Sequence, residues 1–186
     1  MIYLNDDIAG FDFDAALPLL SEQRREQALK FKYVLGRKTC AMAYLLLCEG
    51  LQKEYGLTER PVFEYGEHGK PAIIGHTDIH FNLSHCREAV ICAVSDKPVG
   101  IDIESPRTPR PSLINYTMNA DEAERIRQAP DPSLLFTQLW TMKEALVKLT
   151  ATGITDNLRD VLRRDDVSFH TIFTPRYLYT ICQYKE

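Results

Sequence analysis

The chain has 186 residues, of which 45% are apolar and 26% are charged, and its formal net charge is −4. This length suits one ordinary domain or two compact halves, and the acidic balance argues against general nucleic-acid binding, which needs basic surface. No apolar run reaches the ~20 residues of a membrane span, and the start of the sequence lacks the basic region of a signal peptide. The five cysteines include no C-x-x-C pair, so we expect reduced thiols in a monomeric cytoplasmic protein that binds neither membrane nor nucleic acid.

The first half of the sequence predicts a long helix packed on a small sheet. A basic helical stretch is expected over residues 21–32, followed by a longer helix over residues 37–55 whose interior is nearly all apolar. Short runs of β-branched and aromatic residues, separated by glycine and proline, then predict strands. The expected strands span residues 61–65, 79–83 and 89–94.

The second half begins with an expected strand over residues 99–104 and a proline-rich stretch over residues 105–111. Apolar periodicity then predicts two helices, and alternating patterns predict two closing strands. The helices are expected over residues 121–128 and 133–150, and the strands over residues 167–174 and 177–184. The last strands of the two halves, near residues 89–94 and 179–184, are similar in sequence, which hints at an internal repeat.

Two acidic residues alternate with aliphatic ones in the strand at residues 99–104. Residues two apart in a strand share a face and lie ~7 Å apart, so Asp102 and Glu104 are able to converge on one small ion while Ile101 and Ile103 face the core. Alternating acids also occur on an ordinary solvated sheet face, which is the other interpretation. The aliphatic residues between them indicate a strand buried on one side, where repeated negative charges need a cation.

A second group of charged residues follows on the helix expected at residues 133–150. Residues four apart share one helix face, so Trp140, Glu144 and Lys148 form one stripe. Taken alone, Glu144 and Lys148 have the spacing of a surface ion pair worth only ~0.3–0.5 kcal/mol. Together with the two strand acids they indicate a site with three carboxylates and a lysine.

A third signal lies at residues 80–85, where apolar and polar residues alternate until Ser84 and His85, which we expect to form a turn at the strand end. Asn82 and Ser84 have a structural alternative in satisfying turn backbone groups. His85 has the alternative of an ordinary hydrogen-bonded surface residue. Upstream, Lys70 belongs to a glycine-rich hairpin, in which it is either a plain exposed lysine or a phosphate contact.

These pieces, in this order, resemble the 4′-phosphopantetheinyl transferase family, in its larger type with two halves in one chain. The resemblance rests on four motifs within residues 37–153, which are Gly69-Lys70-Pro71, Phe81-Asn82-Leu83-Ser84-His85, Gly100-Ile101-Asp102-Ile103-Glu104 and Trp140-x-x-Lys143-Glu144-Ala145-x-x-Lys148. It implies an α/β fold of the α+β kind with two pseudo-symmetric halves, each a long helix packed on a small, mostly antiparallel sheet. Residues 1–97 would form the nucleotide side of the site and residues 98–186 the metal side.

The resemblance also implies an activity, that of a holo-[acyl-carrier-protein] synthase. The phosphopantetheine arm of coenzyme A would be transferred to a serine of an apo acyl or peptidyl carrier protein, with release of adenosine 3′,5′-bisphosphate. Carriers of fatty-acid, polyketide and peptide synthesis all remain open. The alternative is a non-catalytic relative that binds coenzyme A or a carrier protein as a scaffold.

Residue roles follow from the same resemblance. It implies Mg²⁺ held by Asp102, Glu104 and Glu144, with Glu144 and Lys148 as catalytic residues and Glu144 as the first choice of base. The implied coenzyme A contacts are Ser84, His85 and Lys148 at phosphates, Lys70 and Pro71 at the adenine side, and Arg37 or Lys38, with Arg37 preferred, at the 3′-phosphate.

Two further questions stay open from the sequence. Glu122 matches a glutamate that some relatives place near the metal, but the segment at residues 119–122 has the form of a helix capping box, which we favour. Because the chain and its carrier are both acidic, any docking patch must be local. The candidates are Arg24, Arg25, Lys30 and Lys32, or the loop from Arg107 to Arg110.

Overall fold

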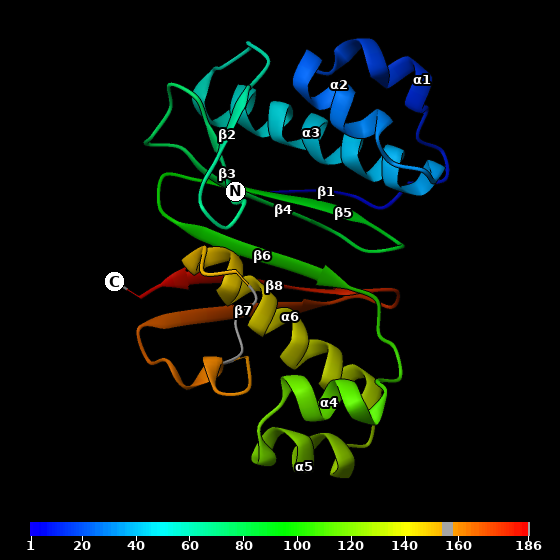
Figure 1. Ribbon diagram of the computed structural model, residues 1–186, viewed down its shortest axis with the longest axis vertical. Helices are drawn as coiled ribbons and strands as arrows, with labels where there is room; N and C mark the ends of the chain where they lie inside the picture. Colours follow the sequence, from blue (N-terminus) through cyan, green and yellow to red (C-terminus); the bar gives the residue numbers. More distant parts are fainter. Residues whose placement is uncertain (154–157, 186) are drawn as a thin grey trace.

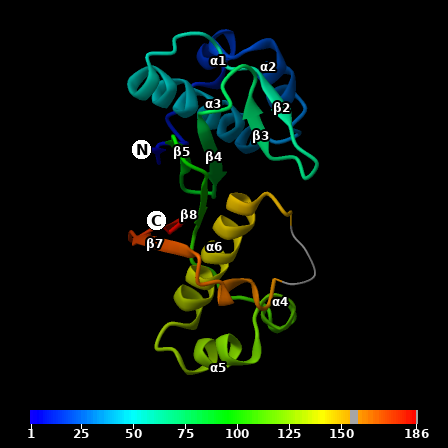
Figure 2. The same ribbon diagram turned by 90° about the vertical axis from the view of Figure 1, so that its left-hand side faces the viewer.

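The computed structural model describes residues 1–153 and 158–185. Its main elements stack in four layers, in the order helix, sheet, sheet, helix (Figure 1). Figure 2, turned by 90°, shows the short helices of the second half at the end of the molecule remote from the first half. Among the described helices, none combines the length and apolarity that crossing a bilayer requires.

The elements from β1 to β5 form the first helix and sheet layers. They are β1 (Ile2–Asn5), α1 (Phe13–Ala16), the 3-10 turn η1 (Leu17–Leu19), α2 (Glu22–Leu29), α3 (Val34–Tyr55), β2 (Phe63–Tyr65), β3 (Pro71–Ile73), β4 (His80–His85) and β5 (Val90–Ser95). The sheet has the antiparallel order β1-β5-β4, and β2 and β3 form a separate hairpin. The N-cap residue Ser21 starts α2 by accepting a hydrogen bond from the Arg24 amide, and Gly56, with φ of 68°, ends α3 in a left-handed conformation that glycine favours.

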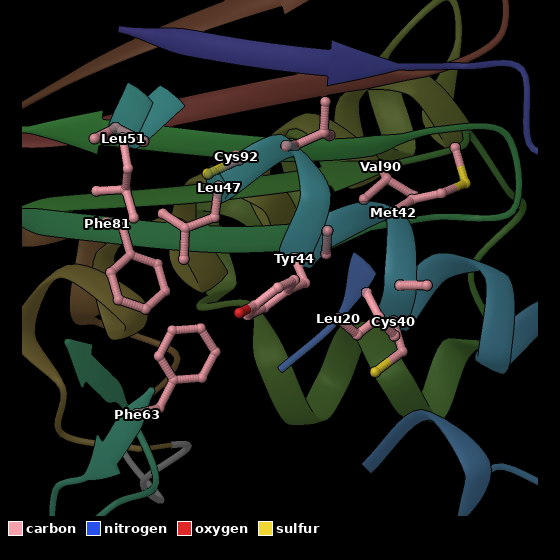
Figure 3. Close-up of a cluster of buried hydrophobic side chains, with 14 of the residues drawn as sticks. Leu20, Cys40, Met42, Tyr44, Leu47, Leu51, Phe63, Phe81, Val90 and Cys92 are labelled. Carbon is pink, nitrogen blue, oxygen red and sulfur yellow. The ribbon is translucent and has the colours of Figure 1, made fainter. Parts of the chain in front are cut away.

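The core of this half lies between α3 and the outer face of its sheet (Figure 3). Phe63 of the hairpin stacks on Phe81 of β4 with ring centroids 5.3 Å apart, and Tyr44 of α3 meets Phe63 edge-on at 6.0 Å. The buried Tyr44 hydroxyl donates to the carbonyl of Pro61 at 3.0 Å, so its polar end is satisfied. The hairpin is therefore fixed to the helix and the sheet at once.

The second half supplies the other two layers. Its elements are β6 (Val99–Glu104), α4 (Pro111–Thr117), α5 (Ala120–Gln128), α6 (Pro132–Thr150), the 3-10 turn η2 (Val161–Arg163), β7 (Val167–Phe173) and β8 (Leu178–Tyr184). The sheet has the antiparallel order β6-β8-β7. Helix α6 packs on its outer face, where Ala145, Leu146 and Leu149 are buried with Val167 and Cys182.

The two sheets meet along β4 and β6, and that seam is where the site is built. Ile101 and Ile103 of β6 are buried against the first sheet, as expected from the sequence. Instead of continuing the backbone ladder, β4 offers side chains, since Asn82 Oδ1 accepts from the Ile101 amide at 2.9 Å and Ser84 Oγ accepts from the Ile103 amide at 3.4 Å. These bonds satisfy buried backbone donors on the edge of β6.

The α+β fold class is confirmed, and the elements predicted from the sequence are present with shifts of a few residues at their ends. The long helix begins at Val34 rather than near residue 37. The turn expected at Ser84 and His85 is wrong, because both belong to β4 and pair with Ile91 and Val90. The pseudo-symmetry and the boundary between residues 1–97 and 98–186 stay predictions, and residues 154–157 and 186 of the second range lie outside the described residues.

Sequence reasoning missed several short elements. Strands β1 and β3 have only four and three residues and carry no long apolar run. Helix α4 follows the proline-rich stretch directly, with Pro111 at its first turn, where a missing backbone N–H costs nothing. Pro111 therefore marks the start of a helix and not the continuation of the loop.

Gly100 lets α6 lie directly against β6. A Cβ at this position would overlap the carbonyl oxygen of Ala145 and lie 2.6 Å from the amide nitrogen of Leu149. Because both atoms belong to helix backbone, no side-chain rotation relieves the clash. The absence of a side chain at Gly100 therefore sets the distance between β6 and α6.

We predict that Gly100→Ala lowers the free energy of unfolding by about 3 kcal/mol, as expected for overpacking that displaces backbone. Urea unfolding followed by circular dichroism measures this. Gly66→Ala is the matched control, because its added Cβ would sit at 3.7 Å from the Lys70 carbonyl oxygen, an ordinary contact. Equal stabilities for the two variants would contradict the close approach.

Candidate functional site

An ion pair between β6 and α6 forms the centre of the site. Lys148 Nζ lies 2.6 Å from Asp102 Oδ1, and the side chain of Asp102 is only 7% exposed. Ser84 joins both groups, since its Oγ donates to Asp102 Oδ1 at 2.8 Å and accepts from Lys148 Nζ at 3.0 Å. Lys148 also donates to the carbonyl of Ile101 at 3.2 Å. The predicted strand acid and helix lysine are thus brought together, and Ser84 of β4 fixes their positions.

Glu144 lies one turn before Lys148 on the same stripe of α6. Burial raises its pKa, the negative charge of Asp102 raises it further, and Lys148 opposes the shift. Two oxygens in this region, Glu144 Oε1 and Asp102 Oδ2, are buried without a hydrogen-bond partner. Buried carboxylate oxygens without a partner are costly, so they indicate a place for a proton or a cation.

Glu104 completes the acidic group at the end of β6. Trp140 Nε1 donates to Glu104 Oε1 at 3.3 Å, and the indole stacks on Phe136 with centroids 6.4 Å apart. Burial raises the pKa of Glu104, and so does Asp102, whereas Arg107, the Trp140 hydrogen bond and Lys148 lower it. The stripe of Trp140, Glu144 and Lys148 therefore faces the two strand acids, as the residue spacings predicted.

Carboxylate oxygens are suitable ligands for a hard divalent cation, but the described side chains are not arranged around one common point. Within residues 1–153 and 158–185, no three His, Cys, Asp or Glu side chains are arranged as a ready metal site. Mg²⁺ needs no such cage, because it keeps several waters and binds through one or two carboxylates plus substrate phosphates. The two unpartnered oxygens of Asp102 and Glu144 are suitable donors. The ligand set of Asp102, Glu104 and Glu144 stays a prediction.

A pocket of about 340 Å³ lies beside this group, where the two halves meet. Its lining comes from α2, the β2–β3 hairpin, β4 and the end of α6, and consists of Arg24, His68, Gly69, Lys70, Pro71, Asn82, Leu83, Val147, Lys148, Ala151 and Gly153. The cations Arg24, Lys70 and Lys148 have no carboxylate among the other lining residues. The pocket therefore suits a ligand with several negative charges.

The predicted residues of the hairpin are in place in this pocket. Lys70 Nζ donates to the carbonyl of Leu149 at 3.1 Å, which joins the hairpin to the last turn of α6, and burial lowers the pKa of Lys70. Pro71 lines the pocket beside it. His85, on β4, is exposed and is not part of the pocket lining. Desolvation by the surrounding protein, and then the positive charge of Lys148, lower its pKa.

Arg37 and Lys38 lie elsewhere, and neither lines the pocket. Arg37 Nε donates to the Phe31 carbonyl at 2.9 Å, and Lys38 Nζ donates to the carbonyls of Ile8 and Ala9 at 3.2 and 3.0 Å. Their contact with a nucleotide stays a prediction that the pocket does not support.

Arg24 is the pocket cation that sequence reasoning did not assign to the site. Its guanidinium donates to the Cys40 carbonyl at 3.1 and 3.2 Å and lies 6.0 Å from the centre of the Phe63 ring. Because these contacts join α2 to α3 and to the hairpin, no local sequence signal could reveal them. The sequence predicts for Arg24 only a place in a possible docking patch.

Glu122 has the capping role favoured from the sequence. Its amide donates to Asn119 Oδ1 at 2.9 Å, and its carboxylate accepts from the Asn119 amide at 3.0 Å, which completes a capping box. The same carboxylate pairs with Lys143 at 2.8 Å.

Comparison of the sequence with known proteins identifies a family. Residues 98–183 match the model of the 4′-phosphopantetheinyl transferase superfamily. The protein named 4′-phosphopantetheinyl transferase psf-1 of Bacillus pumilus is 32% identical over 164 residues, which cover 87% of this chain and 70% of the relative. The chain belongs to this superfamily.

Other relatives carry the same family name. A 4′-phosphopantetheinyl transferase of Bacillus subtilis is 28% identical over 156 residues, covering 82% of this chain and 70% of the relative. The 4′-phosphopantetheinyl transferase AcpT of Salmonella typhi is 41% identical over 97 residues, half of each protein. The similarity to AcpT is higher in identity but confined to a shorter region.

The raised pKa of Glu144 predicts a stability effect that depends on pH. A raised folded-state pKa favours the protonated carboxyl, so the contribution of Glu144 is fully favourable below its ordinary value of 4.5 and is lost as the pH rises through the folded-state value. Without divalent cations, Glu144→Gln should therefore melt at a higher temperature than the wild type at about pH 8. The gain should be about 1.4 kcal/mol for each unit by which the pKa is raised, and should vanish near pH 4.5.

Thermal unfolding in chelator across this pH range measures the difference. Glu26→Gln is the control, because Glu26 is exposed on α2. A constant difference at all pH values between Glu144→Gln and the wild type would show that the carboxyl does not titrate as proposed.

Proposed function

We propose that this chain transfers the 4′-phosphopantetheine arm of coenzyme A to a serine of an apo carrier protein and releases adenosine 3′,5′-bisphosphate. The observation that carries this proposal is the position of the Asp102–Lys148 pair, beside a pocket that three cations line. One side of the site attracts a cation and the other attracts phosphates. A diphosphate bound with a divalent cation fits both sides.

The pocket suits the nucleotide end of coenzyme A. Arg24 and Lys70 are held at the pocket wall by hydrogen bonds to backbone carbonyls, so their positive charges have fixed positions beside the ligand. Lys148 lies at the border between the pocket and the carboxylates, and from this position it would contact the diphosphate. Phosphoryl transfer depends mainly on positioning and charge stabilisation, and these fixed cations supply both.

In the proposed reaction, the serine oxygen of the carrier forms a bond to the phosphorus that carries the pantetheine arm. The bond from that phosphorus to the oxygen of the adenosine phosphate breaks, and the electron pair leaves with this oxygen. Glu144 is the proposed acceptor of the serine proton. Asp102, Glu104 and Glu144 would hold Mg²⁺, which when bound would screen the negative charge of the diphosphate. Lys148 stabilises the charge that develops on the leaving phosphate.

The direct test is incubation of the protein with coenzyme A, Mg²⁺ and a panel of apo carriers from fatty-acid, polyketide and peptide synthesis, followed by intact-mass measurement. We expect the arm on at least one carrier, and Glu144→Gln should slow its transfer by at least about 10²-fold while the fold is kept. Chelation of Mg²⁺ should stop the reaction. Binding of coenzyme A without transfer to any carrier would favour the scaffold alternative.

For the carrier, the structure favours the loop from Arg107 to Arg110 over the patch on α2. Arg24 of the α2 patch is directed into the nucleotide pocket. The loop from Arg107 to Arg110 lines a surface hollow of about 610 Å³ together with Ser112, Leu113 and Tyr116. Tyr116 is 55% exposed. Arg107 is close enough to Glu104 to lower its pKa, so a carrier docked there would present its serine near the carboxylates.

We predict that Arg110→Glu raises KM for an acidic carrier about tenfold at low salt and leaves KM for coenzyme A unchanged, because only the partner's charge is opposed. The effect should fall as salt is added. Lys32→Glu, on the α2 side, is the comparison and should change KM for the carrier little. The opposite ranking of the two variants would place the docking surface on the first half.

A further inference from the structure

Ala151 ends α6 in a backbone conformation that favours glycine. Its φ and ψ are 55° and 27°, which lie in the left-handed region. Within residues 1–153 and 158–185, the other residues with positive φ are all glycines, and one of them, Gly56, ends the long helix α3 at φ of 68°. Ala151 therefore has a side chain at a position where glycine would avoid strain.

The helix end itself does not require a methyl group at residue 151. The carbonyl of Leu149 accepts from Lys70 Nζ at 3.1 Å, and the Thr150 hydroxyl donates to the Leu146 carbonyl at 3.1 Å. Glycine at residue 151 would keep both bonds and would avoid the close approach of Cβ to the following carbonyl oxygen that left-handed backbone imposes. Backbone strain that persists beside a binding pocket indicates a functional reason for the side chain.

Ala151 belongs to the apolar part of the pocket that we assign to the nucleotide. Val147, about one turn earlier on α6, also lines this pocket, and so do Pro71 of β3 and Leu83 of β4. The three cations described above belong to the same lining. The pocket thus combines cations, which suit phosphates, with apolar side chains, which suit the flat face of a base.

A second hollow, of about 480 Å³, adjoins this pocket, and Ala151 lies at the boundary between the two. Lys70, Pro71 and Ala151 line both hollows. Figure 2 shows the end of α6 next to the β2–β3 hairpin, and the bond from Lys70 to the Leu149 carbonyl joins the two elements there. The hairpin contributes two side chains to the shared boundary, and α6 contributes the methyl group of Ala151.

We propose that Ala151 is a binding residue, whose methyl group packs on the base of the nucleotide and keeps the base on the pocket side of this boundary. This inference rests on the proposed function, in which the pocket takes the nucleotide of coenzyme A. Glycine in place of Ala151 relieves the backbone strain but removes an apolar contact with the base. Stability and nucleotide affinity therefore change in opposite directions.

The first measurement needs no ligand. Ala151→Gly should raise the melting temperature, because the relief of strain exceeds the extra freedom that glycine gives the unfolded chain. Gly56→Ala is the matched control, since it puts a methyl group into the same conformation at the end of α3, where an added Cβ has no neighbour within 4 Å. It should melt at a lower temperature than the wild type. If Ala151→Gly does not melt higher, the residue is not strained and the proposal is wrong.

The second measurement is ligand binding by calorimetry. The dissociation constants of coenzyme A and of adenosine 3′,5′-bisphosphate should both rise about fourfold in Ala151→Gly, as expected for the loss of one buried methyl contact. Inorganic pyrophosphate has no base, so its affinity should not change. Gly56→Ala should bind all three ligands as the wild type does. An equal loss of affinity for pyrophosphate would show that residue 151 acts on the cations instead, and would overturn the proposal.

These results separate the role of Ala151 from the proposed function. If the wild type binds coenzyme A but transfers the arm to no carrier, the proposed transfer is wrong, and the affinity ratio still decides the role of Ala151. If the wild type binds neither nucleotide, the proposed function and this inference fail together. If the wild type is active and Ala151→Gly binds both nucleotides as tightly, only this inference fails.

Discussion

The ion pair of Asp102 with Lys148 is the interaction on which the site depends, because it joins the edge strand β6 of the second sheet to the long helix α6. It forms only where helix and strand backbones nearly touch, and Gly100 provides that approach two residues before Asp102. Ser84, on β4 of the first half, hydrogen-bonds to both Asp102 and Lys148 and so connects the first half to the ion pair. A change in the position of either half therefore changes the charge arrangement of the site.

The seam between the sheets explains why the site lies at the junction. If β4 and β6 were joined by a backbone ladder, the side chains of β4 would point above and below the sheet, and none would reach the edge of β6. Asn82 and Ser84 instead accept hydrogen bonds from amides of β6, so the strand edge is satisfied by groups that also have free capacity. Ser84 uses that capacity to position Asp102, which makes one residue both a structural link and part of the site.

The sequence predicted correctly those features that residue spacing within one strand or helix determines. The strand acids and the stripe on α6 were assigned correctly to elements and faces, because spacings of two and four residues fix direction within a strand and a helix. Ser84 and His85 were expected in a turn, since polar residues at a strand end usually satisfy turn backbone, whereas here both pair with β5 of their own sheet. The Ser84 hydroxyl finds its partners, Asp102 and Lys148, in the second half. The place of Arg24 in the pocket was not predicted, because its partners Cys40 and Phe63 are distant in sequence and only packing brings them together.

In the proposed function, the charges of the site would couple the binding of the cation to the binding of the phosphates. Three carboxylates face one ammonium at the β6–α6 junction, and the unpartnered oxygens of Asp102 and Glu144 show that Lys148 does not satisfy them all. The proposed divalent cation would relieve this excess but would also repel Lys148. The diphosphate would relieve that repulsion, because it would attract the divalent cation, Lys148 and the pocket cations Arg24 and Lys70. Each ligand would then remove an electrostatic cost of binding the other, and by linkage each would raise the affinity for the other.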